Sequence, residues 1–175
     1  MYKALTLLAS SALLLTAIGC DQSSSQQSNS VTKTEADPAP HAWLLTSEPA
    51  GAISITEAKS SVKEGDTVVI KGRIGGRHKP MNASSPVFTI VDLELPYCGQ
   101  NADDGCPTPW DYCCETPETI GNNSATVQVV GDGEINPTSA GLEPLDVVIL
   151  VGTVGPRPND QVLTIQATGV YPSDG

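Results

Sequence analysis

The sequence lacks the short motifs that mark the common catalytic and nucleotide-binding sites. It contains no Gly-x-Ser-x-Gly, no His-Glu-x-x-His and no phosphate-binding loop. It has only two histidines, and one of them, His41, lies in a polar segment ahead of the predicted strands. The adjacent carboxylates Asp103 and Asp104 lack the ligand series of a calcium loop. We therefore expect a protein that is not an enzyme and that carries no cofactor.

Basic residues are also scarce. Lys and Arg number nine against twenty Asp and Glu, a net charge of −11. Six of the nine lie between positions 59 and 79, and only Arg157 follows them. Because nucleic-acid binding depends on contacts from Lys and Arg to phosphate, this balance argues against a nucleic-acid partner.

The chain has one long apolar run, at its N-terminus. Residues 4–18 carry no charge and follow Lys3. As a helix they would span about 22 Å, less than the roughly 30 Å hydrocarbon core of a bilayer, so a secretory signal is the better interpretation. The run ends in Ala17-Ile18-Gly19-Cys20, and a polar tract begins at Asp21.

This arrangement resembles the signal of bacterial lipoproteins. The resemblance implies that residues 1–19 form a signal peptide and that Cys20 becomes the lipidated first residue, carrying acyl chains such as palmitate. It also implies a bacterial protein held on the cell membrane by this lipid anchor and facing the periplasm or the exterior. Residues 20–42 are poor in large apolar groups, which predicts a disordered tether before a single domain over residues 43–175.

The rest of the chain predicts a mainly β fold. Ser54 with Glu57 three residues later has the pattern of a capping box and predicts a short helix near 55–62. In the first predicted strand, Ile70 and Ile74 should point one way, and Lys71 and Arg73 the other. Five segments rich in β-branched residues predict strands at 67–74, 86–92, 125–130, 146–154 and 162–170.

The stretch from Gly65 to Ile74 resembles the first strand of many OB-fold domains, and 146–154 repeats its strand-glycine pattern. The resemblance implies a small five-stranded antiparallel barrel over about 62–171, with a short N-terminal helix. Gly72, Gly152 and Gly169 would then mark bends or bulges. The helix usual between strands three and four is not evident in 131–145. An immunoglobulin-like sandwich is the alternative, but it usually needs about seven strands.

A cysteine-rich insertion at 96–119 interrupts the predicted barrel. With Cys20 assigned to lipid, four cysteines remain, and an even number in an exported domain indicates disulfides. Cys113 and Cys114 are neighbours, so a bridge between them would be strained. Two pairings stay open: Cys98–Cys114 with Cys106–Cys113, or Cys98–Cys113 with Cys106–Cys114.

The same four thiols could instead hold zinc or copper(I), or act as redox thiols. The spacing lacks the C-x2-C pairs of zinc ribbons. Adjacent cysteines can ligate copper(I), and His78 and Met81 would suit that ion.

We expect the protein to act as a binding module with a protein or cell-envelope partner. Trp110 and Tyr112 stand out in a chain with a single Phe. A metal carrier or sensor built on the four-cysteine loop is the alternative. The candidate binding surface consists of Lys71, Arg73, Arg77, Trp110 and Tyr112.

Overall fold

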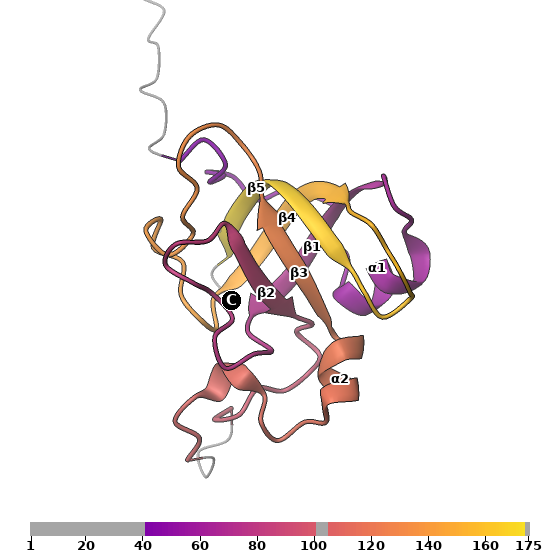
Figure 1. Cartoon of the computed structure of the whole chain (residues 1–175), viewed down its shortest axis with the longest axis vertical. Helices are drawn as coiled ribbons and strands as arrows, with labels where there is room; N and C mark the ends of the chain where they lie inside the picture. Colours follow the sequence, from indigo (N-terminus) through magenta and orange to yellow (C-terminus); the bar gives the residue numbers. More distant parts are fainter. Residues whose placement is uncertain (1–40, 101–104, 174–175) are drawn as a thin grey trace, which may run out of the picture. The chain divides into compact units, whose positions relative to one another are not determined.

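The computed structural model describes residues 41–100 and 105–173 (Figure 1). The expected signal peptide, Cys20 and most of the tether lie outside the described residues. Within them, no helix has the length and apolar character needed to cross a membrane. The elements in chain order are α1 (Ile55–Ser61), β1 (Thr67–Ile74), β2 (Val87–Val91), the 3-10 helix η1 (Pro109–Asp111), α2 (Pro117–Asn122), β3 (Ser124–Val129), β4 (Val147–Val154) and β5 (Thr164–Ser173).

The five strands form a closed barrel in the order β1-β2-β3-β5-β4, with β4 pairing back to β1. This five-stranded barrel confirms the OB-like fold expected from the sequence. Four of the pairings are antiparallel, whereas β3 and β5 run parallel. The parallel pair differs from the all-antiparallel expectation. It arises because the connection after β4 places β5 between β3 and β4, which the pattern of each strand does not reveal.

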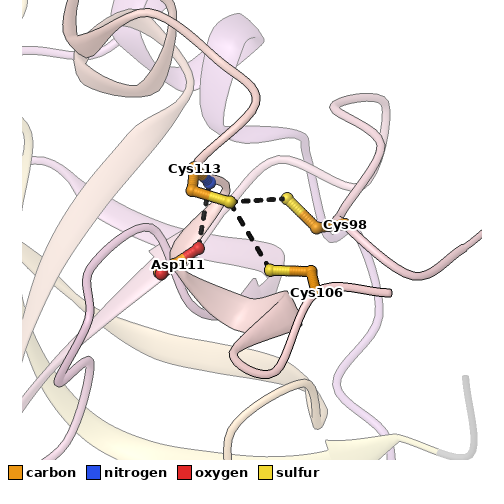
Figure 2. Close-up of side chains that lie close together, drawn as sticks. All are labelled: Cys98, Cys106, Asp111 and Cys113. Atoms are coloured by element: carbon orange, nitrogen blue, oxygen red, sulfur yellow. Dashed lines mark hydrogen bonds between the residues drawn. The ribbon is translucent and has the colours of Figure 1, made fainter. Parts of the chain in front are cut away.

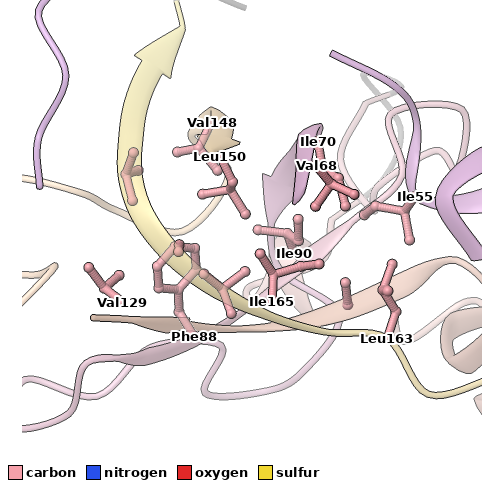
Figure 3. Close-up of a cluster of buried hydrophobic side chains, with 14 of the residues drawn as sticks. Ile55, Val68, Ile70, Phe88, Ile90, Val129, Val148, Leu150, Leu163 and Ile165 are labelled. Atoms are coloured by element: carbon pink, nitrogen blue, oxygen red, sulfur yellow. The ribbon is translucent and has the colours of Figure 1, made fainter. Parts of the chain in front are cut away.

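Alternating side chains fill the barrel. In β1, Ile70 and Ile74 are fully buried, whereas Lys71 and Arg73 are half-buried on the outer face, as the alternation predicted. Phe88, Leu150 and Ile165 also point into the interior, among the side chains drawn in Figure 3. Burying side chains of this size is worth roughly 1.5–3 kcal/mol each, so the core gives the inserted loop a stable base.

The helix α1 is held at both of its ends by hydrogen bonds to other parts of the chain. Ser54 caps it by accepting the Glu57 N–H, as predicted. The carboxylate of Asp92, which is 1% exposed, accepts the Thr56 N–H and hydroxyl, both at 3.0 Å. Asp92 directly follows β2, so this contact anchors α1 to the start of the cysteine-rich segment. At the other end of α1, the Arg157 guanidinium donates to the Lys59 and Val62 carbonyls.

Gly152 allows β4 and β5 to approach closely at a bulge. The pairing register shifts between Val151 and Gly152, so that Thr168 is left out of the ladder. This confirms the expected irregularity at Gly152 and Gly169, whereas Gly72 pairs with Val148 in an unbroken register. A β-carbon on Gly152 would lie 2.8 Å from the Ala167 Cα and closer still to the Gln166 carbonyl oxygen. Only glycine fits here.

The sequence did not predict α2 or η1. Both are short: α2 has six residues and η1 has three, which is too few for an apolar periodicity to show. A local signal exists for α2, because Thr116 accepts the Thr119 N–H and Pro117 occupies the first turn. Residues 131–145 form turns and bends with no helix, in agreement with the sequence.

Candidate metal centre

The cysteine-rich segment between β2 and β3 extends from one end of the barrel (Figure 1). A turn at Trp110–Tyr112 docks it against the chain that follows β1. The Gly76 N–H donates to the Trp110 carbonyl at 2.8 Å. Tyr112 is fully buried, and a β-carbon on Gly75 would lie 2.9 Å from its ring. The glycine at position 75 therefore makes room for the ring that anchors the loop.

Three cysteine sulfurs meet at this turn. The Cys113 Sγ lies 3.6 Å from that of Cys98 and 3.5 Å from that of Cys106, and Figure 2 shows it between the two. The Cys114 Sγ lies 3.5 Å from the Cys98 Sγ. A disulfide needs about 2.05 Å, so none of the four is bridged and the two expected disulfides do not form in this structure. The two separations of 3.5 Å, Cys98–Cys114 and Cys106–Cys113, match one of the two pairings expected from the sequence, and Cys98–Cys113 at 3.6 Å links them.

Asp111 completes the cluster. Its Oδ1 accepts the Cys113 N–H at 2.9 Å, and its Oδ2 accepts the Thr108 hydroxyl at 2.7 Å. Ligand atoms of Cys98, Cys106, Asp111 and Cys113 all lie within 4.8 Å of one another. Sequence reasoning missed Asp111. The available signal was a carboxylate two residues before a cysteine, the spacing at which an Asp accepts that residue's N–H.

Two of the sulfur–sulfur separations among Cys98, Cys106 and Cys113 fit a tetrahedral metal site. An ion 2.3 Å from each thiolate sets sulfur atoms about 3.8 Å apart at the corners of a tetrahedron. The observed separations of 3.5 and 3.6 Å are close to that edge. Three thiolates and one carboxylate form a donor set that suits zinc, and thiolates also suit copper(I).

The surroundings of Cys98 favour its thiolate form. Burial disfavours the charge, but hydrogen bonds with the Cys114 N–H and with the Cys114, Cys113 and Cys106 thiols outweigh it, and the pKa of Cys98 is lowered. Hydrogen bonds with Cys106 and Cys98 raise the pKa of Cys113, because a second thiolate would face the first. A cation is the group that would stabilise several thiolates at once.

The pKa of Asp111 is lowered, mainly because the Thr108 hydroxyl donates to its carboxylate, with the Cys113 N–H adding to the effect. Both donors stabilise the charged form against the opposing effect of burial. The carboxylate is thus ionised and ready to act as an oxygen ligand at neutral pH.

The residues expected to form one binding surface lie at different depths, and Arg73 lies close enough to Tyr112 to act on its hydroxyl. Tyr112 is buried, and the Trp110 indole N–H donates to the His78 carbonyl, so both hold the loop. The Arg73 guanidinium stacks over the Tyr97 ring at 4.7 Å, next to Cys98. Lys71 lies further along the outer face of β1, and Arg77 is exposed beside a shallow groove formed with Gly121 and Ser124.

The two further copper ligands expected from the sequence are placed differently. The His78 Nδ1 lies 4.0 Å from the Asp111 Oδ2, at the exposed edge of the cluster. Met81 packs against the hydrophobic core. His78 is therefore a neighbour of the candidate ligands, whereas Met81 is engaged elsewhere.

No protein-family model matches this chain, and no curated protein sequence does. Among solved structures, an aspartyl tRNA synthetase from Entamoeba histolytica aligns with 74% of this chain and 23% of its own, at 11% identity and a TM-score of 0.41. The telomere capping protein from Saccharomyces pombe aligns over 71% and 84%, at 12% identity and a TM-score of 0.33. The hypothetical protein ygiW from E. coli aligns over 71% and 94%, at 15% identity and 0.34. This chain thus spans about a quarter of the synthetase, and its fold assignment rests on its own strand order.

Proposed function

We propose that this protein is a lipid-anchored, extracytoplasmic binding module whose ligand is a soft metal ion, zinc or copper(I). The ion is held by the thiolates of Cys98, Cys106 and Cys113 and by the carboxylate of Asp111. The observation that carries this proposal is the convergence of these four ligand atoms within 4.8 Å.

The arrangement of the loop supports binding over catalysis. Its ligands come from one short segment that is docked on a rigid barrel through Tyr112 and the Gly76–Trp110 hydrogen bond. Cys106 is half-buried and Cys113 is exposed, so an ion could enter and leave without opening the core. A carrier or a sensor needs such access.

The test is a metal titration of the full chain, purified with reductant and without oxygen. We expect one equivalent of zinc or copper(I) per chain. Co²⁺ in place of zinc should give a thiolate-to-metal charge-transfer band in the near ultraviolet, because three sulfurs coordinate it. A reduced chain that binds no zinc, copper(I) or Co²⁺ would refute the metal-binding function.

The lipid anchor is tested separately through Cys20. We expect the wild-type protein to fractionate with the membrane, and a Cys20→Ser chain to lose its acyl chains and most of its membrane attachment. Two acyl chains contribute about 0.8 kcal/mol per buried methylene, which makes attachment nearly permanent. Incorporation of labelled palmitate measures acylation directly. If Cys20→Ser stays on the membrane and is processed like wild type, the anchor is placed wrongly.

A further inference from the structure

We propose that the metal site is gated by oxidation, through a disulfide between Cys98 and Cys114 that withdraws Cys98 from the metal. The inference rests on the metal-binding function proposed above and adds its regulation. Its basis is that Cys98 belongs to two groups at once. It is one of the four candidate ligands, and its sulfur lies 3.5 Å from a fourth thiol, that of Cys114.

Cys114 stands outside the four-ligand set. It is exposed, whereas Cys98 is 5% exposed. The Cys114 N–H also points to the Cys98 sulfur, which keeps the two residues together. The pair therefore consists of an outer thiol that solvent reaches and an inner thiolate that the metal would use.

The oxidant is a disulfide, RSSR, either a small molecule or the disulfide of a thiol oxidase. The Cys114 thiolate attacks one sulfur of RSSR, forms a mixed disulfide and expels RS⁻. The Cys98 thiolate then attacks the Cys114 sulfur, the Cys98–Cys114 bond forms, and a second RS⁻ leaves. Two protein sulfurs are oxidised and RSSR is reduced to two thiolates, of which one takes the Cys114 proton and the other takes a proton from water. The metal keeps only Cys106, Cys113 and Asp111.

The other close pairs are poorer entry points for the oxidant. Cys98 with Cys113, at 3.6 Å, and Cys106 with Cys113, at 3.5 Å, both lie wholly within the four-ligand set. A thiolate bound to a metal shares its electron pair with the ion and is a weaker nucleophile. Cys114 is thus the sulfur that reacts first while the metal is in place.

The experiment uses the full chain with Cys20→Ser in every sample, so that only the four loop thiols react. Two zinc-loaded chains are compared, one with all four loop cysteines (the wild-type loop) and one with Cys114→Ser. Both are exposed to oxidised glutathione in the presence of a zinc chelator that changes colour on binding. We expect the wild-type loop to release its zinc and the variant to release it at least about tenfold more slowly. Peptide mapping should find Cys98 joined to Cys114, and reductant should restore zinc binding.

Equal release rates from the two chains would overturn the gating, as would a mapped Cys106–Cys113 bridge without a Cys98–Cys114 bridge. Zinc retained by a chain that carries the Cys98–Cys114 disulfide would overturn it as well. These failures differ from failure of the metal-binding function, which is a lack of zinc uptake by the reduced wild-type loop before any oxidant is added.

Discussion

Zinc affinity should fall at least about 100-fold when Cys106 is replaced by serine. Structural zinc sites are worth about 10–16 kcal/mol over four ligands, so one ligand contributes about 3 kcal/mol. Each 1.4 kcal/mol corresponds to about a tenfold change in affinity. Serine keeps the size of the side chain but offers a hydroxyl that does not ionise near neutral pH. Competition with a chelator of known affinity measures the change, and Co²⁺ should lose part of its charge-transfer intensity.

Cys114→Ser is the matched control, because it makes the same chemical change one residue outside the four-ligand set. We expect it to alter zinc affinity by less than about threefold under reducing conditions, a difference that a second-sphere contact can cause. Asp111→Asn should weaken binding by an intermediate amount, since the amide oxygen can still accept the Cys113 N–H. If Cys114→Ser weakened binding as much as Cys106→Ser while Asp111→Asn had no effect, Cys114 would replace Asp111 as the fourth ligand.

Gly152→Ala should lower the free energy of unfolding by about 3 kcal/mol, the upper range for added atoms in a packed interior. The new methyl group would lie 2.8 Å from the Ala167 Cα, and the neighbour is backbone that cannot rotate away. Relief requires β4 and β5 to separate at the bulge, which would disturb the pairing that closes the barrel. Urea denaturation followed by circular dichroism measures the change.

Gly121→Ala provides the comparison. Gly121 lies in α2, and a β-carbon there would meet no atom within 4 Å. Alanine is preferred over glycine in a helix by about 1 kcal/mol, so this variant should be as stable as wild type or slightly more so. A Gly152→Ala chain with unchanged stability would show that β4 and β5 do not approach each other closely at Gly152.

The strands were predictable because each one carries its own signal. The alternation of Ile70 and Ile74 with Lys71 and Arg73 depends only on the two-residue period of a strand, and the structure places them accordingly. Ser54 likewise marks the start of α1 through a contact with its own neighbour, Glu57. The parallel pairing of β3 with β5 carries no such local mark, because it depends on where the connection after β4 leads.

The candidate site, like the fold, was predictable only in part. By itself, the sequence determined which thiols have metal-binding or redox chemistry, since four cysteines in one loop are visible without any structure, but it did not indicate Asp111. Tertiary structure alone decided how they are grouped. Tyr112 docks the loop against Gly75, the Asp111 carboxylate turns toward the Cys113 N–H, and Cys98 comes to lie between its ligand partners and Cys114. The spacing of residues along a chain limits which side chains can meet, but the packing of the loop on the barrel selects those that do.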